Sequence, residues 1–324
     1  MALSPSLGHC GTVALVGQPN VGKSTLLNQV LGQKLSITSR KPQTTRHQIL
    51  GIKTRGRSQA AFIDTPGLRV RACSALDWYL NQQAAAALAG VDLIAFVIEA
   101  LRWREADDFV LRQLDGIAVP VVLVINKVDR VEDKQRLLPF MARMSNYRAY
   151  TEVVPLSARK RTDMVRFEDC VFKHLPLAEQ WFSNNQIRNC SDRFLAGEIV
   201  REKLMRLLGQ EIPYRLGVVV EEYKKTRESA YVIATIWVET KGQKGIVIGN
   251  QGTLIKQVGV AARRDLERLL GRRVYLQTWV KVADKCSEDI VLARQLGYTD
   301  ATRNLIRVQS MVAGKSAAGL NRCE

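Results

Sequence analysis

The stretch Gly17-Gln18-Pro19-Asn20-Val21-Gly22-Lys23-Ser24 lies between a short apolar run at 12–16 and a stretch at 25–31 that is typical of a helix. Strand, glycine-rich loop and helix in this order predict a phosphate-binding loop, whose glycines let successive backbone N–H groups point at a β-phosphate. The N-terminus of the helix faces the same anion. We expect Lys23 to reach the β- and γ-phosphate oxygens and the Ser24 hydroxyl to bind Mg²⁺. The whole stretch is therefore predicted to bind a nucleotide.

A second motif, Asn126-Lys127-Val128-Asp129, follows an apolar run at 119–125 that is typical of a buried parallel strand. It is therefore expected at the carboxyl end of a strand, where open α/β sheets bind ligands. The Asp129 carboxylate can accept hydrogen bonds from guanine N1–H and its exocyclic amine, whereas adenine offers neither donor. The motif predicts selection of GTP and GDP. Ser157 and Ala158 are predicted to form the last base-contacting loop.

The switch elements are expected between these two motifs. Asp64-Thr65-Pro66-Gly67 follows a strand-like run at 60–63, so Asp64 can hold the metal through water and the Gly67 N–H can sense the γ-phosphate. The next residue, Leu68, cannot orient an attacking water as a glutamine would, and we expect slow intrinsic hydrolysis. The predicted catalytic residues are Lys23, Thr45, Asp64 and Gly67.

A polar loop upstream carries the predicted switch I residues Gln43, Thr44, Thr45, Arg46 and His47. Thr45 is expected to close over Mg²⁺ when the γ-phosphate is present, so that the metal ligands are Ser24 and Thr45. The composition of this loop would also fit an ordinary proline-containing connection. Hydrolysis of GTP would release both switch segments, and the chemistry would then act as a conformational switch.

Composition limits the class of protein. The chain has 324 residues, enough for two domains, and 46% apolar residues, which fits a globular protein. No apolar run approaches the roughly 18–20 residues that cross a bilayer, and we see no secretory signal. The six cysteines are scattered without metal-ligand spacing and are expected to be plain thiols in a reducing compartment.

The charge of the chain points to a polyanionic partner. The net charge is +17, and the segment 241–285 alone carries ten Lys and Arg residues against three acidic residues. A basic surface of this kind can meet nucleic acid or anionic lipid, and the charge does not choose between them.

The second half of the chain has a different pattern. The alternation of strand and helix that predicts an α/β domain with a doubly wound, mostly parallel sheet ends near residue 175. A helix capped by Ser191 or Asp192, two strands at 216–223 and 230–239, a glycine-containing loop, a helix at 253–270 and a strand at 274–282 follow. This order predicts an α+β KH domain of type II, whose GxxG loop approaches a nucleic-acid backbone. The predicted RNA-binding residues are Gly249, Asn250, Gln251, Gly252, Lys256 and Arg263.

Together these motifs resemble the Era family of bacterial GTPases, which join a Ras-like GTPase domain to a KH domain. The resemblance is carried by GQPNVGKST, SITSRKPQTTRHQI, DTPG, NKVD, SDRFLAGEIVREKLMRLLGQEIPY and VIGNQGTLIKQVG, and it covers about residues 10–300. It implies GTP-dependent binding to 16S ribosomal RNA near its 3′ end and a role in biogenesis of the 30S subunit. It also implies cytoplasmic location with some peripheral association with the cytoplasmic face of the cell membrane. We expect a monomer.

The chain departs from the family at three places, which are Gln18, the segment 69–78 and residues 301–324, which extend beyond where the family normally ends. Gln18 stands where relatives often carry a basic residue, and its side chain is expected to point away from the phosphates. The segment 69–78 is unusual and leaves the behaviour of switch II open, whereas Leu68 fits a family that lacks the usual catalytic glutamine. The expected domains are 1–175 (GTPase), 176–190 (linker), 191–285 (KH) and 286–324 (a C-terminal helix and flexible tail).

Two other hypotheses compete with an RNA-binding GTPase switch. One is a GTP-regulated switch in membrane association or cell-cycle signalling, with the basic domain meeting lipid. The other is an RNA-binding protein whose GTPase domain is only structural. The intact Lys23, Ser24 and Asp129 argue against the structural role, and the KH pattern argues against membrane signalling as the main role.

Overall fold

The computed structural model describes residues 7–39, 41, 44–68, 70, 75–209, 212–214 and 216–282. They belong to two compact units. Of the described residues, one unit contains those up to Ser36 together with Thr45–Asn189, and the other contains Ile37–Thr44 and those from Cys190 to Val282. The predicted switch residue Gln43, residues 69 and 71–74 of the unusual segment 69–78, and the predicted tail at 286–324 lie outside the described residues.

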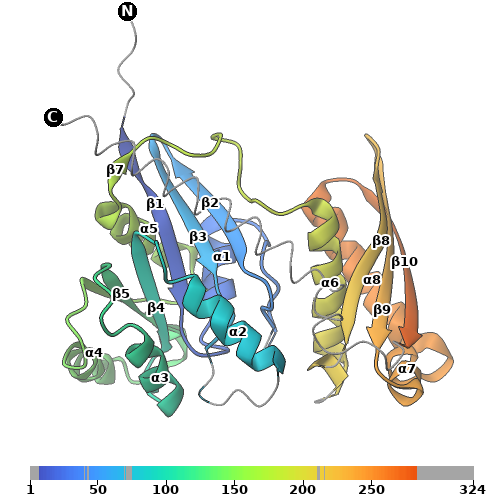
Figure 1. The fold of residues 1–324 in the computed structure, drawn as a ribbon, viewed down its shortest axis with the longest axis horizontal. Helices are drawn as coiled ribbons and strands as arrows, with labels where there is room; N and C mark the ends of the chain where they lie inside the picture. Colours follow the sequence, from blue (N-terminus) through green and yellow to red (C-terminus); the bar gives the residue numbers. More distant parts are fainter. Residues whose placement is uncertain are drawn as a thin grey trace, which may run out of the picture. The chain divides into compact units, whose positions relative to one another are not determined.

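The first unit is a GTPase-type α/β domain. Its sheet has the order β2-β3-β1-β4-β5-β6, all parallel except the β2–β3 pair, with β7 antiparallel to β1. The predicted doubly wound, mostly parallel sheet is confirmed (Figure 1). The strands are β1 (Gly8–Val16), β2 (Ile49–Arg55), β3 (Ser58–Asp64), β4 (Leu93–Glu99), β5 (Val121–Asn126), β6 (Glu152–Pro155) and β7 (Leu177–Ala178). The helices are α1 (Lys23–Leu31), α2 (Ala75–Ala86), α3 (Glu105–Gln113), α4 (Leu137–Ser145) and α5 (Arg161–His174), with 3₁₀ turns η1 (Val128–Arg130) and η2 (Lys134–Arg136).

Unbroken apolar runs explain the central strands. Every residue of β5 is buried, as is every residue of β4 except Glu99, because both faces of a parallel sheet are covered. β1 and β3 end at Val16 and Asp64, and β5 ends at Asn126, so the predicted loops all leave the same edge of the sheet. This edge forms the candidate nucleotide site.

The segment that follows α5 returns to the sheet of the first unit. β7 pairs with β1, and the Ile52 N–H donates to the Ile187 carbonyl at 2.8 Å. Gln59, fully buried on β3, holds the part of this segment that lies between β7 and Ile187. Its Oε1 accepts hydrogen bonds from the backbone N–H groups of Trp181 and Phe182 at 3.0 and 2.9 Å. The predicted linker at 176–190 therefore has ordered contacts up to Asn189, whose N–H donates to the Leu50 carbonyl.

The second unit has the order of elements predicted for a KH domain. It contains α6 (Asp192–Leu207), η3 (Ile212–Tyr214), β8 (Gly217–Lys225), β9 (Ser229–Val238), α7 (Lys241–Ile248), η4 (Asn250–Gly252), α8 (Thr253–Leu270) and β10 (Arg273–Val282). The sheet order is β10-β9-β8, with β10 parallel to β9 and β8 antiparallel to it. Of the two predicted caps for α6 it is Ser191 whose side chain accepts the Phe194 N–H.

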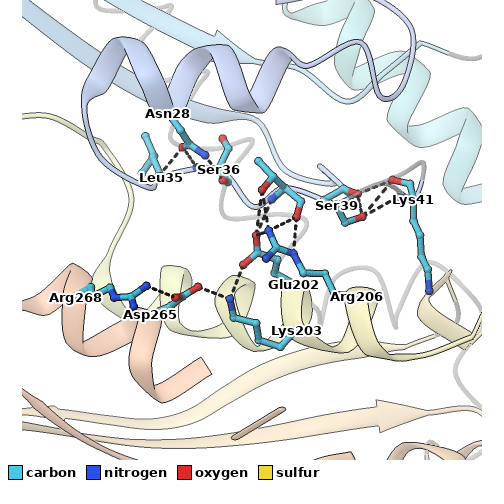
Figure 2. Close-up of polar contacts among 12 residues, drawn as sticks. Asn28, Leu35, Ser36, Ser39, Lys41, Glu202, Lys203, Arg206, Asp265 and Arg268 are labelled. Atoms are coloured by element: carbon cyan, nitrogen blue, oxygen red, sulfur yellow. Dashed lines mark hydrogen bonds and ion pairs between the residues drawn. The ribbon is translucent and has the colours of Figure 1, made fainter. Parts of the chain in front are cut away.

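Helix α6 is buried on more than one side. Its apolar residues, such as Ile199 and Leu204, pack into the core of the second unit. Its buried charges lie elsewhere on the helix and are paired, as burial of an ion requires. Figure 2 shows the network in which Lys203 binds both Glu202 and Asp265 of α8.

The described residues contain no helix that is long and apolar enough to cross a membrane. Cys10, Cys170 and Cys190 are not joined by a disulfide bond within the described part of the chain. The other three cysteines lie outside the described residues or carry no description of their side chains.

Replacing Gln59 by leucine tests the contact that returns the chain to the sheet. The substitution leaves two partly buried N–H groups without an acceptor, and we expect it to lower the free energy of unfolding by roughly 2–3 kcal/mol. Chemical denaturation measures this loss. Thr54→Val is the matched control, because Thr54 only accepts a hydrogen bond from Gln59 Nε2, and it should cost much less.

Candidate functional site

The phosphate-binding loop has the backbone that its glycines predict. Gly17 and Gly22 have φ values of 147° and 108°, and Asn20 adopts the left-handed region at 66°. A Cβ atom at Gly22 would lie 2.2 Å from Asn126 Nδ2, so only glycine fits beside the guanine-binding motif. Lys23 is buried and donates to the carbonyls of Gly17 and Gln18 at 2.9 and 3.0 Å. Burial lowers the pKa of its ammonium to about 8.

Oxygen atoms suited to Mg²⁺ gather at the start of α1. The hydroxyls of Ser24 and Thr45, the two predicted metal ligands, lie 2.9 Å apart. Asp64 is fully buried at the end of β3, and among the described residues nothing hydrogen-bonds to either of its carboxylate oxygens. Burial raises the pKa of Asp64, although Lys23 and the nearby hydroxyls oppose the shift. A buried carboxylate without a partner beside two hydroxyls fits a hard divalent cation with oxygen ligands.

The guanine-binding motif is held by Asn126. Its Nδ2 donates to the Val21 carbonyl at 2.7 Å, and its Oδ1 accepts the N–H groups of Lys127 and Ala158 at 2.7 and 2.9 Å. This one side chain thus connects the phosphate-binding loop with both predicted base-contacting loops. Asp129 is exposed at the same edge, and the Ser157 hydroxyl holds its pKa below the usual value. Asp129 is ionised and ready to accept hydrogen bonds from a base.

In the segment after β3, Gly67 lies at the nucleotide site and Leu68 packs in the core. A Cβ atom at Gly67 would approach the Pro19 nitrogen to 2.7 Å, so the switch glycine lies directly against the phosphate-binding loop. Thr65 is buried and donates to the Leu15 carbonyl at 2.7 Å. Leu68 is buried in the apolar core of the first unit. Its side chain therefore serves packing, as expected for a residue that cannot orient water.

The predicted switch I residues belong to both units. Thr44 lies in the second unit, and Thr45, Arg46 and His47 lie in the first. Thr44, Arg46 and His47 are buried, whereas Thr45 is partly exposed. Packing within the protein therefore restricts the three buried side chains. Within the second unit, Glu202 accepts the Thr38 N–H at 3.0 Å, and Arg201 donates to the Thr44 carbonyl at 2.5 Å.

The GxxG loop joins α7 to α8 as predicted. Gly249 and Gly252 both have φ of 75°, and Gln251 has 48°, which a run of ordinary residues would not adopt. A Cβ atom at Gly249 would meet Leu254 Cβ at 2.7 Å, whereas the space around Gly252 is open. Lys256 and Arg263 are both exposed on α8, and a spacing of seven residues puts them on one side of the helix.

Two groups were not anticipated from the sequence. Gln18 donates to Asp107 at 2.8 Å, which explains why its side chain turns away from the phosphates, and burial raises the pKa of Asp107 to about 6. Cys170, His174 and Glu152 approach each other within 4.8 Å. Burial and the adjacent carboxylate raise the pKa of Cys170 to about 12. Glu152 is already engaged by His174 at 3.2 Å, so internal pairing accounts for this cluster without a metal.

Two family models match the chain. The model of the 50S ribosome-binding GTPases matches residues 12–127, and the model of the KH domain matches residues 211–285. The first match contains the phosphate-binding loop and ends at Lys127, within the guanine-binding motif. The second contains the GxxG loop.

Curated relatives and solved structures are similar over nearly the full chain. GTPase Era of Pseudomonas aeruginosa PAO1 is 48% identical over 91% of this chain and 97% of its own. GTPase Era of Marinobacter nauticus is 47% identical over 90% and 96%. A tyrosine-to-alanine variant of Aquifex aeolicus Era bound to GDP·AlF₄⁻ has a TM-score of 0.85 at 36% identity, covering 90% of this chain and 99% of that one. Era in complex with MgGDPNP and nucleotides 1506–1542 of 16S ribosomal RNA matches with the same values.

Replacing Asp64 by asparagine should have opposite effects on stability and on metal binding. The raised pKa means that the carboxylate costs stability as the pH rises above the ordinary range for aspartate, so Asp64→Asn should stabilise the nucleotide-free protein near pH 7.5 by roughly 1–3 kcal/mol. This gain should vanish at low pH. The variant should also lose most of the thermal stabilisation that Mg²⁺ with a GTP analogue gives. Asp169→Asn, on an exposed ion pair, should do neither.

Replacing Asp129 by asparagine tests base recognition. The amide can no longer accept two hydrogen bonds from guanine, and we expect the preference for GTP over ATP to fall by about a hundredfold or more. Competition binding with both nucleotides measures the ratio. A variant that still preferred GTP strongly would show that another group reads the base.

Proposed function

The chain belongs to the Era family of GTPases, and we propose that it is a switch that hydrolyses GTP and whose nucleotide state controls binding of its KH domain to 16S ribosomal RNA near the 3′ end. The observation that carries this proposal is the presence, in one chain, of a complete guanine-nucleotide site and a KH domain with an intact GxxG loop. In this role the protein acts in biogenesis of the 30S subunit.

The nucleotide half of the proposal rests on the edge of the first sheet. Asp129 selects guanine, Lys23 and the backbone of residues 17–24 bind the phosphates, and Ser24, Thr45 and Asp64 hold Mg²⁺, which neutralises charge on the phosphates. With Leu68 buried, no side chain at that position orients water. Intrinsic hydrolysis is therefore slow, and the GTP-bound state lasts long enough to act as a timer.

The link between nucleotide and RNA rests on residues 37–44. This segment precedes the switch threonine Thr45, yet it belongs to the same unit as α6. Arg201 holds the Thr44 carbonyl, and Glu202 holds the Thr38 N–H. Glu202 also binds Lys203, which pairs with Asp265 of α8 (Figure 2). A movement of Thr45 on hydrolysis pulls on this buried network, and the network ends on the helix that follows the GxxG loop.

The RNA half of the proposal rests on the second unit. The solved Era complex contains nucleotides 1506–1542 of 16S ribosomal RNA, which belongs to the small subunit. The family model that names the 50S subunit matches only residues 12–127 and stops before the KH domain. We therefore assign the target from the relative that shares both domains. The exposed Lys256 and Arg263 beside the loop contribute phosphate contacts.

The location of the protein follows from the same proposal. Binding to ribosomal RNA supports a cytoplasmic location, and the charge of +17 also allows peripheral contact with the anionic face of the cell membrane. We propose that the protein acts as a monomer. The competing hypothesis, a membrane or cell-cycle switch, would require binding to anionic vesicles that depends on GTP and exceeds binding to RNA. Co-sedimentation with vesicles containing phosphatidylglycerol distinguishes the two.

A charge at Gly252 tests the RNA site. Gly252→Asp adds a carboxylate where the RNA backbone approaches and should weaken binding to nucleotides 1506–1542 by at least about tenfold, roughly 1.4 kcal/mol. Gly252→Asn is the matched control, since asparagine has the same shape without the charge and tolerates the left-handed backbone. Gly249 is unsuitable because a side chain there collides with Leu254. Equal RNA affinity of both variants, with GTP affinity unchanged, would contradict the site.

A further inference from the structure

The outer face of the KH sheet carries large aromatic side chains. Along β10, residues at every second position point away from the core, and this side of the strand includes Tyr275 and Trp279, each 52% exposed. On β9, Tyr231 is 47% exposed on the same face, because it pairs directly with Tyr275 in the sheet register. The opposite side of both strands packs against α6 and α8 in the core of the unit. Half-exposed aromatic rings gathered on one face are typical of a binding surface.

Two of the three rings, those of Tyr231 and Tyr275, hold each other by stacking. Tyr231 and Tyr275 are stacked with their centroids 4.8 Å apart and an angle of 12° between their planes. Trp279 lies four residues further along β10, roughly 13 Å away along the strand. Beside it, Trp237 of β9 receives the Lys281 ammonium at 5.6 Å from its ring. Fixed rings lose little conformational freedom on binding, and flat rings are what unpaired bases stack on.

Cations flank the aromatic row at both ends. Arg273 precedes Tyr275 on the same side of β10, and Lys281 follows Trp279 in the same way. The carboxylates on this face are already neutralised, since Glu221 binds Lys281 at 3.2 Å and Glu222 binds Lys224. Within this row the face therefore offers rings for bases and, at Arg273, a cation for phosphate, while Lys281 and Lys224 neutralise the carboxylates that would otherwise repel RNA.

We propose that the outer face of the β9–β10 ribbon is a second contact surface for unpaired RNA, on which bases stack against Tyr231, Tyr275 and Trp279. The inference rests on the proposed function, because it extends the RNA contact beyond the GxxG loop. β10 is the edge strand of the sheet and also packs against α7, the helix that leads into that loop. An RNA strand that leaves the GxxG groove can thus continue over the edge of β10 onto the rings.

The chemistry of the face favours RNA over an apolar partner. Apart from Ile233, which is half-buried, the outward positions of β9 and β10 carry aromatic, polar or cationic side chains rather than the aliphatic side chains of a typical protein interface core. The net charge of +17 also gives the chain a long-range attraction for a polyanion.

The test compares a long and a short RNA on the full-length protein bound to a GTP analogue. The long RNA is nucleotides 1506–1542, and the short one is an unpaired RNA of roughly six nucleotides, which fills only the GxxG groove. Tyr275→Ala and Trp279→Ala should each lower the affinity for the long RNA by about tenfold or more and leave the affinity for the short RNA unchanged. Tyr275→Phe and Trp279→Phe keep a ring and should restore affinity. Gln277→Ala, between them on the same face, should have no effect.

The other possible outcomes contradict either the second RNA surface or the proposed function, and each outcome shows which of the two is wrong. If Gly252→Asp weakens both RNAs while the alanine variants weaken neither, the sheet face is not an RNA surface and the proposed function stands. If Gly252→Asp also has no effect, the proposed function itself fails. If the alanine variants lower the melting temperature without changing RNA affinity, the rings serve packing within the protein and the proposed RNA surface is wrong. If the alanine variants lose binding to anionic vesicles but keep their RNA affinity, the face binds lipid and the proposed RNA surface is wrong.

Discussion

The nucleotide site depends on one buried carboxamide. Asn126 donates to the Val21 carbonyl and accepts the N–H groups of Lys127 and Ala158, so three loops that are far apart in sequence share one side chain. Gly22 must be glycine because any Cβ there would collide with that amide. The guanine-reading loop and the phosphate-binding loop are thus fixed relative to each other before nucleotide arrives. Such preorganisation raises the affinity for the nucleotide, because binding does not have to order the loops first.

Buried charge makes the site responsive to its ligand. Asp64 has no hydrogen-bonding partner among the described residues, and Lys23 has a lowered pKa, so both groups remain incompletely compensated within the protein. A bound phosphate group and Mg²⁺ would supply the missing partners and offset the cost of burying these charges.

The second unit uses buried charge differently, because the buried charges described on α6 are paired with opposite charges. Arg201 is engaged by Glu198 at 2.7 Å, and Glu202 and Lys203 are likewise paired. These contacts hold residues 37–44 on the same helix that supports the KH sheet. Removing one partner of such a pair is costly, because it leaves the other charge buried and uncompensated.

Local patterns determined much of this protein. The phosphate-binding loop, the guanine-binding motif, the GxxG loop and the bounds of α8 could be read from glycine positions, apolar runs and periodicity, because backbone conformation and burial act over a few residues. Contacts between distant residues could not be read in this way. The pairing of Gln18 with Asp107, the clamp of Gln59 on Trp181 and Phe182, and the placement of residues 37–44 beside α6 follow from packing that brings separate segments together. The sequence by itself determined which ligands the loops can bind, whereas only the tertiary structure decided which buried groups are paired, since desolvation and partnership depend on the whole fold.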